Sequence, residues 1–222
     1  MRSAAQLGFS IIELMVGVTL ALLIAAAAAL LLASSVGENR RLLLEARLTQ
    51  DLRSAIDLVA RQTRRAGHWS AASTLGLWSA SAGAVPNPYA AMTLDAGASD
   101  TLTLRYSQDT NENNAVDGTE LVAFRLRNRA LEAQLGEHTW QALTDASTLV
   151  VTRFHIQPSI QSSTLESACA CADSETCTAP RVQVRSVEIE ISGQAVNDAS
   201  VQRTVRSTVR LRNDNVSGGC NS

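Results

Sequence analysis

The chain has 222 residues, of which 45% are hydrophobic and 18% are charged, and its formal net charge is −2. This near balance of acids and bases provides no global field that would attract nucleic acid, so we expect no nucleic-acid partner. Without an N-terminal anchor and its helical extension, about 155 residues remain, which is enough for one domain with a hydrophobic core.

The N-terminal part of the chain is an apolar run that contains a single ionisable side chain. Between Phe9 and Ala33, that side chain is Glu13. A helix over this run, at about 1.5 Å per residue, would be roughly 38 Å long and would cross the ~30 Å hydrocarbon core of a membrane. A carboxylate at that depth costs on the order of 2.5–3.5 kcal/mol, so an intramembrane acid indicates a function.

The residues around this acid resemble the class III signal of type IV prepilins and pseudopilins. Gly8 precedes Phe9, and Glu13 is the fifth residue after the glycine. In that family a membrane peptidase cuts after the glycine, the new N-terminal residue is N-methylated, and the glutamate guides packing into a filament. The resemblance implies cleavage between Gly8 and Phe9, methylation of Phe9, and contact between Glu13 and the N-terminus of a neighbouring subunit.

Three other kinds of segment share some of these features. A secretory signal peptide has a shorter apolar core and an Ala-x-Ala exit, for which Ala25–Ala29 offers a site. A plain signal anchor has no need for the Gly-Phe step or for Glu13. A buried core helix rarely has so long an uninterrupted apolar run. The prepilin signal therefore fits the segment best.

Charge counting leaves the orientation of this segment open. Arg2 precedes the apolar run, whereas Arg40 and Arg41 follow it, and the positive-inside rule counts such basic residues. The prepilin resemblance implies a leader in the cytoplasm and one crossing of the inner membrane. The head domain would then lie in the periplasm and, after assembly, on a pilus at the cell surface.

Beyond the apolar run, residues 40–66 place their apolar side chains on one helical stripe. Gly67 follows as a C-cap. We therefore expect one helix over residues 9–66. The expected domains are a leader at 1–8, a transmembrane and filament-core half-helix at 9–36, an amphipathic half-helix at 37–67 and a β-rich head at 68–222. The stripe comprises Leu44, Leu48, Leu52, Ala55, Ile56, Val59 and Ala60.

The head domain begins with an expected long loop at residues 68–100 and continues with segments of alternating apolar and polar residues. We expect Pro158 to stop one strand and a bulge at Arg185 and Ser186 in another. Antiparallel strands with one face on a helix indicate an α+β fold, and the order matches the pilin fold. The expected strands are 101–106, 121–127, 130–135, 140–143, 149–156, 182–192 and 201–212.

Two further segments resemble PilW-type minor pilins. These proteins often carry an Ala-Gly-aromatic step at the end of the long helix and a Leu-Arg-Asn sequence near the C-terminus. Here the segments are residues 65–69, Arg-Ala-Gly-His-Trp, and residues 208–213, which end in Leu-Arg-Asn. His68 stands where the aromatic residue is usual, and Trp69 follows it.

The loop at residues 109–120 has the spacing of an EF-hand calcium loop. Calcium binds six to eight hard oxygen ligands supplied by a tightly curled backbone. Asn114 stands where glycine is usual, and asparagine tolerates a positive φ better than most residues. The alternative is a polar hairpin loop made of good turn formers. The expected Ca²⁺ ligands are Asp109, Asn111, Asn113, Asp117 and Glu120, with Ala115 through its carbonyl.

The chain contains four cysteines, for which two disulfides and a zinc site are the alternatives. Zinc sites usually show Cys-x₂₋₄-Cys pairs, which fit these spacings poorly, so disulfides are favoured. Because a bridge between Cys169 and Cys171 would be strained, we expect one of them to pair with Cys177 and the other with Cys220. The sequence leaves the pairing open.

We find no catalytic constellation, because His68, His138 and His155 lack the motifs of hydrolases or zinc proteases. We therefore expect a structural protein without a required cofactor, and the resemblance implies a minor pilin. Its implied partners are the prepilin peptidase, other minor pilins, the major pilin and the pilus assembly platform. The alternatives are a minor pseudopilin of type II secretion and an adhesive module that binds through residues 68–100 and the loop at residues 109–120, here called the acidic loop.

Overall fold

The computed structural model describes residues 10–73, 86–94, 100–108, 112–165 and 178–219. The chain divides into two compact units, Met1–Leu44 and Glu45–Ser222. Gly8, Phe9, Asp109, Asn111 and the four cysteines lie outside the described residues, so the predictions made for them stay predictions.

The helix α1 (Ile11–Arg65) begins in the first unit and ends in the second. It confirms the predicted helix to within two residues at its N-terminal end and one at its C-terminal end. Its N-terminal part is long and apolar enough to cross a membrane, and no residue in its most apolar stretch is buried. Large apolar side chains such as Ile11, Leu23 and Leu32 are exposed there.

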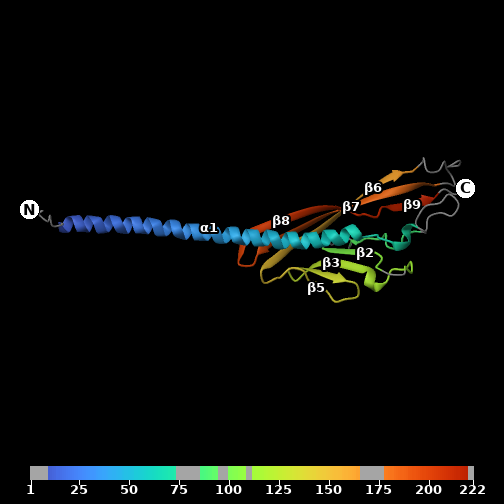
Figure 1. Cartoon of the computed structure of the whole chain (residues 1–222), viewed down its shortest axis with the longest axis horizontal. Coiled ribbons are helices and arrows are strands. Elements are labelled where there is room, and N and C mark those ends of the chain that lie inside the picture. The colour runs from blue at the N-terminus through green and yellow to red at the C-terminus, as the bar shows by residue number, and fades with distance from the viewer. Residues whose placement is uncertain (1–9, 74–85, 95–99, 109–111, 166–177, 220–222) are drawn as a thin grey trace, which may run out of the picture. The chain divides into compact units, whose positions relative to one another are not determined.

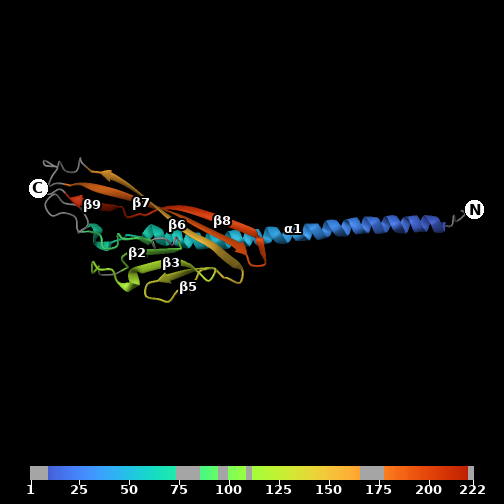
Figure 2. The same cartoon turned by 180° about the vertical axis from the view of Figure 1, so that it is seen from behind.

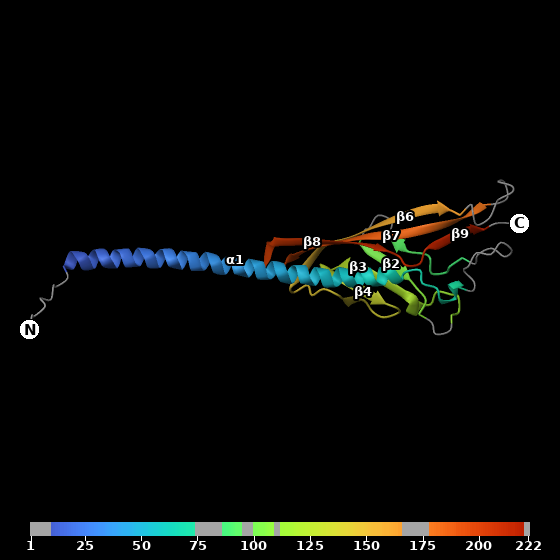
Figure 3. The ribbon, with the colours of Figure 1, turned by 45° about the horizontal axis from the view of Figure 1, so that its top comes forward.

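In the second unit, α1 forms part of the core of the head. Leu52 and Val59 are completely buried, and the predicted apolar stripe is confirmed from Leu48 onward, whereas Leu44 is half-buried. In Figures 1 and 3, this part of the helix runs beside strands of both sheets. The helix therefore supplies the apolar surface against which the head folds. Its buried residues are Leu48, Leu52, Ala55, Ile56, Val59, Ala60 and Thr63.

The first sheet is antiparallel and has the strand order β1-β2-β3-β4-β5. Leu102 and Leu104 of β2 alternate with polar residues and are completely buried, and Phe124 of β3 is completely buried as well. One face of this sheet therefore joins the core. The bounds are β1 (Thr93–Leu94), β2 (Thr101–Arg105), β3 (Leu121–Arg127), β4 (Ala130–Leu135) and β5 (Gln141–Ala142).

The second sheet has the order β6-β7-β8, and a further strand, β9, also pairs with β7. Strands β8 and β9 occupy different stretches of β7, which Figure 2 shows from behind. The bounds are β6 (Leu149–Thr164), β7 (Thr178–Ala195), β8 (Asp198–Arg210) and β9 (Asn215–Gly219). The antiparallel α+β architecture is therefore confirmed, with β9 as a strand that we did not predict.

The expected loop at 68–100 is not entirely irregular. It contains a 3-10 helix at Ser70–Ser73 and the short strand β1. Both elements are too short to show a periodic pattern of apolar residues, which is the signal on which strand and helix prediction depends.

The expectation that Pro158 stops its strand is wrong. The strand β6 continues to Thr164, and Pro158 pairs with Val187 of β7. Within the described part of the chain β6 is an edge strand, paired with β7 alone. An edge strand tolerates proline because N–H groups on its open side take no part in the ladder.

The expected bulge at Arg185 and Ser186 is also wrong. The ladder between β6 and β7 runs through both residues without a shift. Arg185 is buried on the same face as Val187 and Ile189, because side chains alternate along a strand. The apparent change of phase in the sequence therefore comes from a charged side chain on the buried face.

Candidate functional site

Glu13 lies in the first turn of α1 and is exposed. The side chains next to it are apolar and largely exposed, with Ile12 at 73% and Leu14 at 63%. A carboxylate near a helix N-terminus is favoured by the positive end of the helix dipole. In an apolar surrounding, it also needs a cationic partner. The assembly role expected of Glu13 stays a prediction, and the structure places the residue in the exposed first turn of α1.

The end of α1 is closed by chain segments that are distant in the sequence. The Arg212 N–H donates to the Arg64 carbonyl at 3.2 Å, and Asn213 Nδ2 donates to the Ala66 carbonyl at 3.2 Å. Asn87 Nδ2 donates to the Gly67 carbonyl at 2.8 Å. Arg64 lies in the last turn of α1, whose carbonyls have no partner within the helix, and Ala66 and Gly67 are the two residues after it. These bonds therefore tie the end of the helix and the residues that leave it to the rest of the head.

Gly67 confirms the predicted C-cap. Its φ is +75°, in the left-handed region that glycine occupies without penalty. Its N–H donates to the Arg105 carbonyl of β2 at 2.8 Å. The two segments that resemble PilW-type minor pilins thus meet here, since Ala66 and Gly67 of one lie against Asn213 of the other.

Arg185 completes this helix end, and the sequence analysis missed it. The side chain is 7% exposed. Its guanidinium donates to the Ala90 carbonyl and, at 3.0 Å, to the Asn213 carbonyl. Burial lowers the pKa of Arg185, and the nearby Asp214 carboxylate opposes that change. An arginine within the apolar alternation of β7 was the available signal.

The acidic loop is built around the hydroxyl of Tyr89. The hydroxyl oxygen lies 2.9 Å from Glu112 Oε1, 2.9 Å from the Ala115 carbonyl and 3.2 Å from Glu120 Oε1. Glu120 is fully buried and also accepts bonds from the Gln108 and Asp117 N–H groups, each at 3.0 Å. The two carboxylates thus connect the loop to the residues before β1.

Of the predicted calcium ligands, the structure describes those at residues 113–120, whereas Asp109 and Asn111 lie outside the described residues. Asn114 has the positive φ, 61°, that the predicted turn requires. The Glu120 carboxylate is occupied by hydrogen bonds, and Asn113 Nδ2 donates to Asp117 Oδ2 at 2.9 Å. Within the described ranges, no group of three or more His, Cys, Asp or Glu residues is arranged to hold a metal ion. The described residues of the loop, 112–120, are therefore held by hydrogen bonds among themselves and to Tyr89 and Gln108.

The pKa values of Glu112 and Tyr89 shift in opposite directions. Desolvation raises the pKa of Glu112, but hydrogen bonds from Ser107, Asn114, Tyr89 and Ser70 outweigh it and leave the pKa below its usual range. Burial, together with the two carboxylates, raises the pKa of Tyr89 strongly, so the hydroxyl keeps its proton. Glu112 is thus held ionised as an acceptor and Tyr89 as a donor.

Arg65, at the C-terminal end of α1, packs against an aromatic ring of the head. The Arg65 guanidinium lies 4.4 Å from the centre of the Tyr106 ring, and Tyr106 donates to Gln62 Oε1 at 2.9 Å. Together with Glu137 and His138, these residues line a groove of about 740 Å³. His138 lines this groove, whereas His68 and His155 do not. The groove therefore does not unite the histidines into one site.

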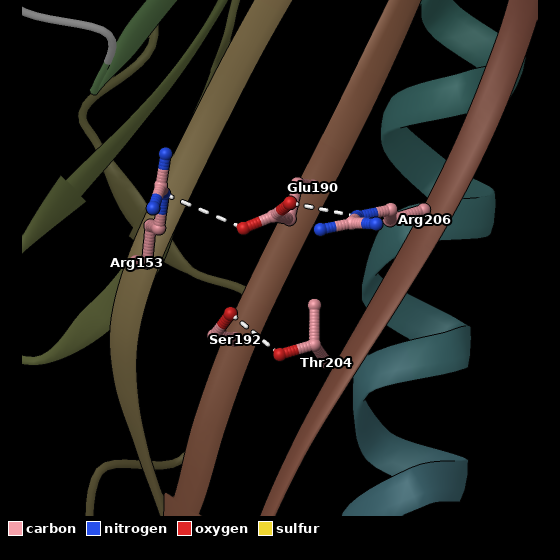
Figure 4. Close-up of polar contacts among 5 residues, drawn as sticks. All are labelled: Arg153, Glu190, Ser192, Thr204 and Arg206. Atoms are coloured by element: carbon pink, nitrogen blue, oxygen red, sulfur yellow. Dashed lines mark hydrogen bonds and ion pairs between the residues drawn. The ribbon is translucent and has the colours of Figure 1, made fainter.

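The outer face of the second sheet is polar. Figure 4 shows Glu190 on β7 between Arg153 of β6, at 3.4 Å, and Arg206 of β8, at 2.7 Å. Ser192 and Thr204 form a hydrogen bond of 2.8 Å on the same face. Such cross-strand pairs stabilise the sheet modestly and keep this face compatible with water.

Residues 41–211 match the model of a protein family described as PpdB, prepilin peptidase-dependent protein B. The matched range covers the second half of α1 and most of the head, but it does not include the Gly8-Phe9 step or Glu13. No curated protein and no solved structure matches the chain. The family match and the N-terminal signal are therefore separate observations on separate parts of the chain.

We predict that Gly67→Ala destabilises the head by about 1–3 kcal/mol, because alanine is strained at a φ of +75°. Its Cβ would also lie 2.8 Å from a terminal nitrogen of Arg185. Urea unfolding of the full chain in detergent, followed by tryptophan fluorescence, measures the change. Gly67→Asn is the matched comparison, since asparagine accepts a positive φ but keeps the Cβ. An unchanged midpoint for Gly67→Ala would contradict the role of this cap.

We predict that acid loosens the loop through Glu112. Its pKa is lowered in the folded state, so its contribution to stability is present above the usual value of 4.5 and is lost as the pH falls through the lowered pKa. Glu112→Gln should flatten the dependence of the unfolding midpoint on pH below about 4.5. The exposed Glu188→Gln is the control, and equal slopes for parent protein and Glu112→Gln would refute the prediction.

The predicted calcium site has its own test. If the loop binds Ca²⁺, millimolar Ca²⁺ raises the unfolding temperature of the parent protein, because a ligand of the native state stabilises it. Asp109→Ala should abolish the increase, whereas Asp198→Ala, at the first residue of β8, should retain it. If the unfolding temperature of the parent protein is the same with and without Ca²⁺, the loop does not bind the ion.

Proposed function

Because the chain belongs to the prepilin peptidase-dependent protein B family, we propose that it is a minor pilin of a type IV pilus. In this role it inserts into the inner membrane by its apolar helix, with the head in the periplasm. It then primes assembly of a pilus or is incorporated into one. Its function is structural rather than catalytic, and its finer relationship is to PilW-type minor pilins.

The observation that carries this proposal is the exposed apolar half of α1 with Glu13 in its first turn. Such a surface is stable in a membrane or against other apolar helices, but not in water. The prepilin peptidase would cut between Gly8 and Phe9, and Phe9 would be methylated. The partners that follow are other minor pilins, the major pilin and the assembly platform.

The role proposed for Glu13 is to neutralise the N-terminal amine of a neighbouring subunit. Removing one partner of a buried ion pair costs roughly 3–5 kcal/mol, because the remaining charge is left uncompensated. The pair would therefore fix the register of one subunit against the next as well as stabilise the contact.

Two other functions remain as alternatives within the proposal. A minor pseudopilin of a type II secretion system has the same layout of anchor and head. An adhesive module at a pilus tip would use the acidic loop and residues 68–100 as its binding surface. Deletion of the gene separates the first alternative, since loss of secretion with intact pili indicates a pseudopilin. Binding of a surface ligand by the full chain would support the second.

We predict that Glu13→Ala leaves processing intact and impairs assembly, because the peptidase site lies at Gly8 and Phe9. Intact-mass measurement of the purified protein reports cleavage and methylation, and electron microscopy reports piliation or filament incorporation. Glu38→Ala is the matched control, because Glu38 is an exposed acid of the same helix beyond the apolar run. Normal assembly by the Glu13→Ala protein would refute the role.

A further inference from the structure

Strand β6 has an open edge along its second half. Among the described residues it pairs with β7 alone, and the ladder continues to Thr164. Figure 1 shows this part of β6 at the outside of the second sheet. From Ser159 to Thr164 every side chain is exposed, and Ile160 is 60% exposed. Charged side chains usually keep an edge strand from pairing with another chain. Residues 157–165 contain no charged side chain, so this edge lacks that protection.

One hydrogen bond fixes which backbone groups of β6 point at β7. In an antiparallel ladder, pairs that exchange N–H···O bonds alternate with pairs whose N–H and C=O groups point away from each other. The Leu165 N–H donates to the Pro180 carbonyl at 2.8 Å, and Thr164 and Arg181 are the preceding pair of the register. Residues 159, 161 and 163 therefore bond to β7, and the even-numbered residues point their backbone groups outward.

A second hydrogen bond gives the same phase. Ile160 is the Cα partner of Arg185. The Arg185 carbonyl, however, accepts from the Leu211 N–H at 3.0 Å, on the side of β7 where β8 pairs. The N–H groups of Ile160, Ser162 and Thr164 consequently point to the open edge, where a further strand could accept from them.

The two faces of β6 differ in polarity at this edge. Pro158 and Ile160 share a face with Val187 of β7, because Pro158 and Val187 are Cα partners and side chains alternate along a strand. An added strand would therefore fit best with apolar side chains on the face of Ile160 and polar ones on the other. The other face of β6 carries Ser159, Gln161 and Ser163.

We propose that residues 158–164 of β6 bind an extended segment of another protein chain as an additional strand. In strand addition, backbone hydrogen bonds supply the affinity and alternate side chains supply the specificity. The segment that fits is uncharged, contains no proline and is apolar at every second residue. The proposal does not depend on the proposed pilin function, because it concerns the head alone.

A second copy of β6 fits this edge less well. In a symmetric antiparallel pair centred on Ile160, Pro158 of each copy would face Ser162 of the other copy. Pro158 has no N–H to donate, so the new ladder would lose a hydrogen bond on either side of its centre. A segment without proline would form both bonds, and the edge therefore favours a segment of different sequence.

Amide hydrogen exchange of the full chain in detergent, resolved to single residues by mass spectrometry, tests the proposal. The probe is an end-blocked heptapeptide of alternating threonine and valine at millimolar concentration, and the control peptide has proline in place of each valine. The probe should slow exchange at Ile160, Ser162 and Thr164 by at least about tenfold, whereas the control peptide should not. Gln161 and Ser163 should exchange slowly with either peptide, because they bond to β7.

Either of two results would overturn the proposal. Unchanged exchange at Ile160, Ser162 and Thr164 in the presence of the probe would show that the edge does not accept a strand. Slow exchange at these residues without any peptide would show that the edge is already covered, by the chain itself or by a second copy.

Two proline variants separate the open edge from the ladder. Ser162→Pro removes an outward N–H, so it should weaken the protection of Ile160 and Thr164 by the probe and leave the unfolding temperature unchanged. Ser163→Pro removes an N–H that bonds to β7, so it should lower the unfolding temperature. Ser162→Thr keeps the N–H and should behave as the parent chain. Equal protection in Ser162→Pro and Ser162→Thr would contradict the proposed pairing.

Discussion

The closure of the C-terminal end of α1 is the constraint on which the head depends. Backbone carbonyls at and just beyond a helix end that are removed from water without a partner would cost roughly 1–3 kcal/mol each. Asn87 and Asn213 supply side-chain donors, and Arg212 supplies a backbone donor. Arg185 adds a buried positive charge beside the negative end of the helix dipole. Three distant segments must therefore be in place before the helix end is satisfied.

The two parts of helix α1 differ in which of their side chains are apolar and which are buried. Up to Ala33 its exposed side chains are apolar on every face apart from Glu13 and Thr19, which suits lipid or neighbouring helices. From Leu48 onward only one stripe is apolar, and that stripe is buried in the head. The proposed assembly role depends on this division, because the head folds without using the surface that the membrane or filament would cover.

In the acidic loop, a buried carboxylate is stabilised by hydrogen bonds. Glu120 has no exposure to solvent, but it accepts backbone N–H bonds from Gln108 and Asp117 as well as contacting Tyr89. A buried carboxylate is tolerated when its oxygens are hydrogen-bonded. The described residues of the loop, 112–120, are therefore held in part by the same side chains that suggested calcium in the sequence. These contacts show a use for Glu120 that needs no metal.

The sequence by itself determined the elements that repeat locally. The long helix, its Gly67 cap, its buried stripe and the alternation of most strands follow from spacing along the chain, because i, i+3 and i, i+4 positions or alternate residues share a face. The N-terminal signal also depends on adjacent residues alone. Only the tertiary structure decided what Pro158, Arg185 and Asn213 do. Their roles depend on which strand lies at an edge, which face is buried and which segments meet at the helix end, and these are contacts between residues far apart in the chain.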